Sequence, residues 1–386
     1  MLFTFCYLYF LQGDILAEAQ YVYSNGLTTY NLLVGSLIIT VTLQVIQWIV
    51  ALLSRLPSRW HALTYIPSML LLAILTDVNK SVLQHFTFGA WLWVAPLILI
   101  LYIILAIVAH RVDAHYNSAS QPFKSQLYPN YIILFILILL VGGIPHTSDV
   151  YHYELKAERL ILQGDYEAAS QVGENSFRTS ARLTQLRMYA LSQQGQLAER
   201  LFDYPQHYGS QGLLDIADTL PLYRFSARHI CAHLGAYCGR SIHSTQQYYQ
   251  LMLSDSLWNQ HTADYYLCSV LLDKRLQEFQ RQLPRYYNLA DSLPNAYDHL
   301  PKAYREALLI VGDRDQALNG KVVIGHHTLA TFSDQDLVQQ YREYCQTKAD
   351  IADPTQRINQ THRHFGHTYW WYYDYSHLAK GELEKK

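Results

Sequence analysis

Three histidines near the end of the chain are spaced so that they could bind a metal ion. His362, His364 and His367 fall within six residues, and Asp374 follows as a carboxylate ligand. Imidazole and carboxylate groups are common ligands of Zn²⁺. This spacing matches no established metal motif, so exposed or ring-stacking histidines are the simpler interpretation. We therefore expect no metal and no cofactor.

Two glutamines lie inside a long apolar segment, where polar side chains are costly. Gln44 and Gln47 are three residues apart, so they share one helix face with Thr40 above them. They could line a substrate site, but hydrogen bonds between helices are the simpler explanation. No Asp, Glu, Lys or Arg lies well inside an apolar segment, whereas proton relays and ion pathways usually need one.

Sequence motifs typical of enzymes are absent. The chain contains no HExxH motif, no nucleophile elbow and no phosphate-binding glycine loop. The formal net charge is -2 and no segment is strongly basic, so nucleic acid is not an expected partner. The sequence therefore favours a protein that is not an enzyme.

Charge and hydropathy divide the chain at Pro145. Only five of the 29 basic and four of the 31 acidic residues precede this proline. The region 1–145 is predicted to be a transmembrane helical domain with four to five spans, the fifth being the short run at its start. The predicted spans are residues 1–17, 32–53, 62–76, 88–109 and 131–144.

The charges of the loops predict the orientation of these spans. Loops 54–61 and 110–130 carry a basic excess, whereas the alternating loops 12–31 and 77–87 do not. Cytoplasmic loops are enriched in Lys and Arg. The N-terminus is therefore expected in the cytoplasm, and the chain beyond Pro145 on the extracytoplasmic side.

Beyond Pro145 the sequence consists of amphipathic helical pairs. The turn at Gly164 recurs at Gly195, 31 residues later. Glycine suits the end of a helix because it adopts positive φ without strain. Recurrence at this period predicts a helical solenoid over residues 146–310. The side chains expected to pack the first pair are Tyr153, Ala157, Leu160, Tyr166 and Ala169.

These positions resemble the aromatic, small and turn positions of the tetratricopeptide repeat. The whole layout is similar to an uncharacterised family of bacterial polytopic membrane proteins with a tetratricopeptide-like C-terminal domain. Residues 190–205, 300–308 and 365–373 carry this second resemblance. It implies a location in the bacterial inner membrane, with the repeat domain in the periplasm, and it implies no known activity.

An aromatic run occupies the C-terminal segment 311–386. Tyr369, Trp370, Trp371, Tyr372 and Tyr373 are consecutive. The run could cap the last helical pair, contact the membrane interface or bind a glycan by ring stacking. We expect capping.

The five cysteines include no CxxC pair. Cys231 and Cys238 are seven residues apart, which is too far for a relaxed disulfide on one straight helix. We expect buried thiols, although a bridge between Cys238 and Cys268 is an alternative.

Together these patterns predict an all-α protein, a transmembrane bundle followed by a tetratricopeptide-like solenoid. The expected function is a protein-interaction scaffold that binds an unidentified extracytoplasmic or membrane protein, with the lipid bilayer as its other partner. The alternative is a subunit of an enzyme or transporter that handles envelope glycans or lipids, with a polar site between the membrane helices.

Overall fold

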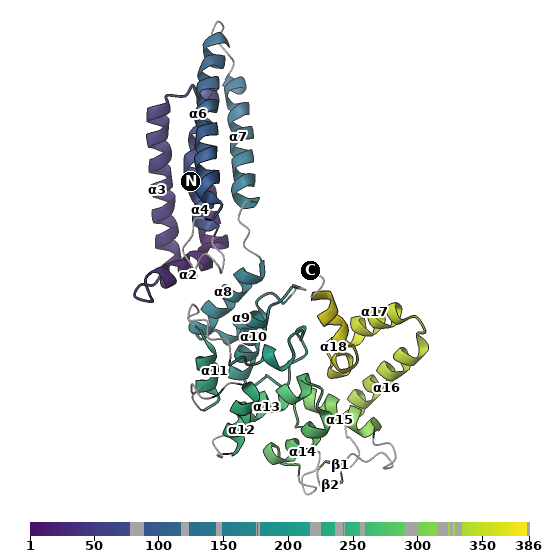
Figure 1. Cartoon of the computed structure of the whole chain (residues 1–386). Helices are drawn as coiled ribbons and strands as arrows, with labels where there is room; N and C mark the ends of the chain where they lie inside the picture. The colour runs from purple at the N-terminus through teal and green to yellow at the C-terminus, as the bar shows by residue number, and fades with distance from the viewer. Residues whose placement is uncertain are drawn as a thin grey trace. The chain divides into compact units, whose positions relative to one another are not determined.

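A computed structural model shows the fold of the chain (Figure 1). Apart from one pair of two-residue strands, the described elements are helices, so the predicted all-α class is confirmed. The chain divides into two compact units, Met1–Leu155 and Lys156–Lys386. The structure describes residues 1–77, 89–116, 123–143, 149–174, 176, 178–216, 225–235, 242, 244–254, 259–289, 299–314, 323–324, 327–328 and 334–383.

The first unit contains long apolar helices joined by short helical segments. Two of its helical stretches, Leu32–Ser54 and Trp91–Asp113, are long and apolar enough to cross a membrane. Leu2–Leu11 and Leu127–Gly143 are shorter apolar helices. The helices are α1 (Leu2–Cys6), α2 (Gly13–Tyr23), α3 (Leu32–Ser54), α4 (Ile66–Thr76), α6 (Trp91–Tyr116) and α7 (Phe123–Gly143).

The helices of this unit differ in extent from three of the predicted spans. Residues 1–17 do not form one helix, because the helix that begins with α1 and continues as the π-helix Tyr7–Leu11 is interrupted at Gln12 before α2. The predicted span 62–76 begins as the 3₁₀ helix Ser58–Tyr65 and continues as α4. The 11 residues of α4 are only ~16 Å long, about half the thickness of a bilayer core. Helix α7 starts at Phe123, well before the predicted residue 131.

Polar side chains of α3 point inward while many of its large apolar side chains are exposed. Ser36, Thr40 and Gln47 are at most 4% exposed. Their spacing of four and seven residues places them on one face of the helix, which is buried. Ile38 and Trp48 are 58% and 62% exposed. This is the reverse of the usual distribution in a water-soluble protein.

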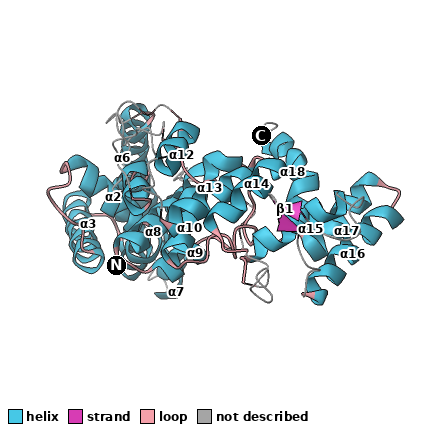
Figure 2. Cartoon of the chain, turned by 90° about the horizontal axis from the view of Figure 1, so that it is seen from below, coloured by secondary structure: helices cyan, strands magenta, loops and turns pink. Residues whose placement is uncertain are grey.

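The second unit is a succession of short helices, seen from below in Figure 2. Helix α8 (Asp149–Leu162) extends across the division between the two units. Strands β1 (Val323–Ile324) and β2 (His327–Thr328) form an antiparallel pair. The other helices are α9 (Tyr166–Gln171), α10 (Ala181–Gln193), the 3₁₀ helix Gly209–Gly212, α11 (Ala227–His233), α12 (Thr245–Ser254), α13 (Gln260–Leu272), α14 (Leu276–Tyr286), α15 (Lys302–Arg314), α16 (Gln335–Asp350), α17 (Pro354–Phe365) and α18 (Tyr369–Leu383).

The same turn ends three helices of this unit. Gly164, Gly195 and Lys274 have φ values of +79°, +68° and +59°. Each donates its N–H to the carbonyl three residues earlier, and the next residue donates to the carbonyl five residues before it. This pair of bonds defines the Schellman motif, which satisfies carbonyls left open at a helix end. Glycine avoids the strain of positive φ at the first two turns.

Helix starts in this unit are set by polar caps. The Asp165 side chain accepts from Ala168 N–H, and Asn259 accepts from Thr262 N–H at 2.8 Å. Such caps satisfy N–H groups that have no partner within the helix. The cap of α16 is Asp334, which accepts from Leu337 N–H at 3.0 Å.

Candidate functional site

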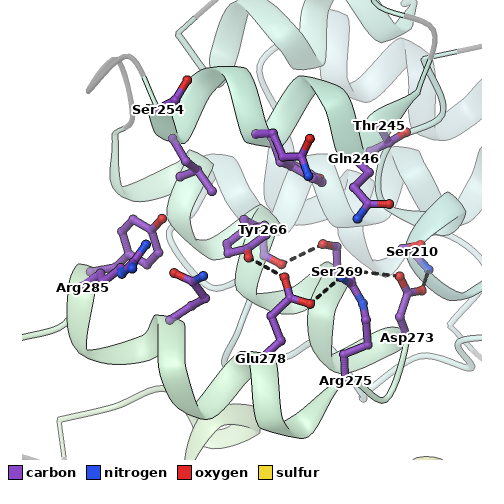
Figure 3. A pocket seen from close by; sticks show the side chains of 15 residues that line it. Ser210, Thr245, Gln246, Ser254, Tyr266, Ser269, Asp273, Arg275, Glu278 and Arg285 are labelled. Carbon is purple, nitrogen blue, oxygen red and sulfur yellow. Dashed lines mark hydrogen bonds and ion pairs between the residues drawn. The ribbon is translucent and has the colours of Figure 1, made fainter. Parts of the chain in front are cut away.

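A cleft of about 430 Å³ lies between α12, α13 and α14 (Figure 3). This volume falls within the ~300–1,000 Å³ typical of ligand pockets. The cleft is open to solvent, and each of the three helices contributes one face to it. A cleft of this kind can receive a segment of another molecule without rearrangement of the fold.

Helix α14 forms a charged wall of the cleft because it is strongly amphipathic. Leu276, Phe279 and Leu283 are at most 4% exposed and pack into the core. The adjoining face of the helix carries polar residues at spacings of three, four and three. These cleft-lining residues are Arg275, Glu278, Gln282 and Arg285.

Helix α12 forms an uncharged wall. Gln246, Tyr249, Gln250 and Leu253 lie at the spacings expected for one side of a helix and line the cleft. The amides of Gln246 and Gln250 are exposed and make no hydrogen bond within the described part of the chain. Each amide can both donate and accept hydrogen bonds. This wall therefore suits a neutral polar group such as a peptide main chain.

Ion pairs hold the charged wall in place (Figure 3). Glu278 accepts from the Tyr266 hydroxyl at 2.7 Å and from Arg275 Nη1 at 2.6 Å. Arg275 Nη2 lies 3.2 Å from Asp273 Oδ2, and Asp273 Oδ1 accepts from Ser210 N–H at 3.4 Å. Burial and the bond to Glu278 raise the pKa of Tyr266. Tyr266 therefore stays a neutral donor, and the carboxylates are oriented before any ligand binds.

Two buried polar atoms of the cleft lining have no hydrogen-bond partner among the described residues. They are the hydroxyl of Tyr249, a residue 3% exposed, and Oε1 of Gln282. Burial raises the pKa of Tyr249 well above its usual value. A buried group without a partner costs ~1–3 kcal/mol.

The histidines of the predicted metal site point to different neighbours. The His362 ring packs edge-on against Trp371 at 4.6 Å, and burial, then His367, lower the pKa of His362. His367 Nδ1 lies 3.2 Å from the Asp203 carbonyl oxygen. His364 lines a separate groove between α16 and α17. Within the described ranges, no group of three His, Cys, Asp or Glu side chains is placed to hold a metal.

Asp374, the carboxylate considered with these histidines, belongs to another network. It accepts from the Tyr344 hydroxyl and from Lys348 Nζ. This network joins α16 to α18. Asp374 therefore links two helices, and no hydrogen bond or ion pair joins it to the three histidines among the described residues.

Gln44 and Gln47 form a hydrogen-bonded chain to the neighbouring 3₁₀ helix. Gln44 Nε2 donates to Gln47 Oε1 at 2.7 Å, and Gln47 Nε2 donates to Thr64 Oγ1 at 2.8 Å. The Thr64 hydroxyl donates in turn to the His61 carbonyl at 2.7 Å. Contacts of this kind hold helices together in apolar surroundings. These hydrogen bonds also engage the side-chain amides of Gln44 and Gln47 that would have to bind a substrate.

Of the residues predicted to pack the first helical pair, Tyr153 belongs to the first unit and the others belong to the second. Ala157 and Ala169 are fully buried, whereas Tyr153 and Leu160 are half-buried. The Tyr166 ring meets the Tyr189 ring edge-on at 6.3 Å. Because α9 contacts α10, this aromatic pair lies between consecutive helices.

The aromatic run packs inside the second unit. Tyr369, Trp370 and Tyr372 are at most 6% exposed. The Tyr369 and Tyr372 hydroxyls donate to the carbonyls of Leu271 and Leu272 at 3.2 and 2.7 Å, at the end of α13. These contacts support the capping role and leave the three buried rings unavailable for a membrane surface or a glycan.

The expectation that the cysteines are thiols is wrong for Cys231. Cys231 is disulfide-bonded, whereas Cys6, Cys268 and Cys345 are thiols. The objection to a bridge close to Cys231 assumed one continuous helix. Helix α11 ends at His233, and Gly235 turns the chain with a φ of +98°.

The cleft was not predicted from the sequence. The charged stripe of α14 is visible in the printed sequence, as are the amides of α12. Their meeting depends on both helices packing beside α13, and no local pattern specifies that contact. The regular spacing of polar residues on α14 was the feature of the sequence that could have indicated the cleft.

Comparison with known proteins gives a family and no activity. No curated protein and no solved structure matches the chain. The profile of one family matches residues 81–238 and 238–376, which is more than half of the chain. The expectation of an uncharacterised family is thus confirmed, and the chain belongs to the family of unknown function DUF6057.

Proposed function

We propose that this protein is a multi-pass membrane protein of the bacterial envelope whose helical-repeat unit docks a segment of another protein. The observation that carries the proposal is the preformed cleft between α12, α13 and α14. Helical-repeat proteins commonly bind partners along a groove built by successive helices. The cleft offers charges, neutral amides and tyrosines, the mixture that recognises a polypeptide segment.

The first unit supports the membrane part of the proposal. The polar face of α3 is buried while its apolar side chains are exposed, as in a helix surrounded by lipid. Exposed apolar residues continue along α6 and α7. Patches of this extent mark membrane or protein contact. With α3 and α6 as spans, the shorter apolar stretches Leu2–Leu11, α4 and Leu127–Gly143 bring the total to four or five.

Two observations support a periplasmic second unit. The basic residues of the first unit concentrate in loops 54–61 and 110–130, which are then cytoplasmic. Cys231 takes part in a disulfide, and disulfides persist in the oxidising periplasm rather than in the cytosol. The charges of the loops and the disulfide at Cys231 are independent observations, and both support a periplasmic location of the second unit.

The recurring turns support a tetratricopeptide-like solenoid. Gly164 and Gly195 are 31 residues apart and make the same two hydrogen bonds. Gly235 and Lys274, both with positive φ, follow at intervals of 40 and 39 residues. Intervals of 30 to 40 residues are typical of stacked helical pairs.

Photo-crosslinking in native membranes tests the docking role. A photoreactive amino acid replaces Gln250 in the cleft, and a second variant places it at Gln246. A third places it at Arg281, an exposed residue of α14 that does not line the cleft. We expect both cleft positions to crosslink to one segment of the same protein, mapped by mass spectrometry, and Arg281 to give no such product. Equal products at all three positions, or none in the cleft, would contradict the proposal.

A further inference from the structure

The charges of the cleft are separated along its length. Asp273 and Glu278 share one guanidinium, that of Arg275, so this end has a formal charge of -1. Arg285 lies at the opposite end, where it is exposed and forms no ion pair with any described residue (Figure 3). The α12 wall adds no charge. The cleft is therefore negative at one end and positive at the other.

A ligand that satisfies both ends must carry the opposite pair of charges. A cation suits the carboxylates of Asp273 and Glu278, and a carboxylate suits the guanidinium of Arg285, which can bind it with two parallel hydrogen bonds. The exposed amides of Gln246 and Gln250 lie on the opposing wall and can bond to a main chain. A polypeptide supplies all three kinds of group.

The geometry of α14 sets the spacing of those charges. Glu278 and Arg285 are seven residues apart, which is about 10 Å along a helix that rises ~1.5 Å per residue. An extended chain in the polyproline II conformation advances ~3.1 Å per residue and has three residues per turn, so side chains three residues apart point to the same side. About three residues of a bound segment therefore cover the distance between the two ends.

We infer that the cleft binds an extended segment of a partner protein with a basic and an acidic side chain about three residues apart. The basic side chain lies at Asp273 and Glu278, and the acidic one at Arg285. This rests on the proposed docking function and specifies its ligand. Complementary charge at both ends also excludes segments with two like charges, because one of them would meet a like charge in the cleft.

Four labelled peptides test the inference by fluorescence anisotropy on the full chain in detergent micelles. Each has eight residues, capped ends and one central sequence: Lys-Ser-Ser-Glu, Gln-Ser-Ser-Gln, Lys-Ser-Ser-Lys or Glu-Ser-Ser-Glu. An exposed ion pair contributes up to ~1 kcal/mol, or about fivefold in affinity. We expect the Lys-Ser-Ser-Glu peptide to bind at least fivefold more tightly than the other three.

Charge reversal gives the matched comparison. Arg285→Glu should weaken binding of the Lys-Ser-Ser-Glu peptide about tenfold and make Lys-Ser-Ser-Lys the preferred ligand. Arg281→Glu changes the same charge on the same helix outside the cleft and should alter neither affinity. Circular dichroism checks that both variants keep the helical content of the parent.

Each other outcome contradicts a specific claim. Equal binding of all four peptides, or no binding at millimolar concentration, overturns the charge pattern. If crosslinks from Gln246 and Gln250 still map to one protein segment, the docking function survives that result. If those crosslinks are also absent, the docking function fails together with its proposed ligand.

Discussion

Replacing Glu306 with glutamine should stabilise the packing of α18 above pH 7 and leave it unchanged near pH 4. The Glu306 carboxyl is 1% exposed, and burial raises its pKa from the ordinary 4.5 to about 7. It accepts from Tyr369 N–H at 2.6 Å, at the start of α18, and Lys302 Nζ lies 3.9 Å away. Glutamine retains an acceptor for Tyr369 and carries no charge to bury.

The direction of this effect follows from proton linkage. Because the pKa of Glu306 is higher in the folded state, the folded state binds more protons than the unfolded chain between pH 4.5 and 7. Stability from this group is complete below pH 4.5 and is lost as the pH rises through 7. A shift of this size is worth at most about 3 kcal/mol.

Hydrogen exchange of the α18 amides in the full chain measures this change. We expect the free energy of opening to fall between pH 4.5 and 7 in the parent and to fall less in Glu306→Gln. Glu343→Gln removes an exposed carboxylate from α16 and should leave the pH profile unaltered. If the free energy of opening changes with pH in the same way in the parent and in Glu306→Gln, the pKa of Glu306 is not raised in the folded state.

His233→Gln should remove an opposite pH dependence from the junction of α10, α11 and α13. His233 Nε2 lies 3.0 Å from Ser192 Oγ, its Nδ1 lies 3.1 Å from Gln193 Nε2, and its ring lies 4.3 Å from that of His261. Burial, and then His261, lower the pKa of His233 to about 4. The junction is therefore built around a neutral imidazole.

The pH dependence of stability from His233 has the opposite sign to that from Glu306, because the pKa of His233 is lower in the folded state than in the unfolded chain. Between pH 4 and 6.5 the unfolded chain binds more protons, so stability is present above pH 6.5 and is lost as the pH falls through 4. The loss amounts to at most about 3 kcal/mol. At pH 7 we expect His233→Gln to be somewhat less stable than the parent, because glutamine reproduces the hydrogen bonds of the imidazole imperfectly. We also expect the variant to lose much less stability than the parent as the pH falls.

Exchange of the α11 and α13 amides between pH 7 and 4 checks this expectation. His364→Gln, on the exposed side of α17, serves as the control. An undiminished acid loss in His233→Gln would assign the effect to another group. The contributions of Glu306 and His233 to the pH dependence of stability have opposite signs between pH 4.5 and 6.5, so they partly cancel in the parent. In each single variant, the pH dependence of stability that comes from the other group should become measurable.

Long periodic segments were predicted well because their signal is local. The apolar run at 32–53 corresponds to α3, and the turns predicted at Gly164 and Gly195 follow the ends of α8 and α10. Changes of helix type within short segments were missed, such as the π-helix Tyr7–Leu11. A single extra residue in a helical turn leaves no clear trace in hydropathy.

Contacts between distant residues could not be predicted from spacing. Glu306 and Tyr369 are 63 residues apart, and Ser192 and His233 are 41 apart. The three C-terminal histidines are close in sequence, yet α17 ends at Phe365 and directs them to different neighbours. The candidate cleft likewise depends on helix packing, although each of its walls is an ordinary amphipathic face.

Protease treatment of intact spheroplasts tests the central claim that a membrane-embedded unit presents the helical repeats outside the cytoplasm. Added protease should degrade the chain beyond Pro145 and leave a membrane-bound fragment of the first unit. A periplasmic marker protein should be cut and a cytoplasmic one spared in the same sample. If the region beyond Pro145 stays intact until the spheroplasts are lysed and is digested only then, the second unit is cytoplasmic and the proposed docking site faces the wrong compartment.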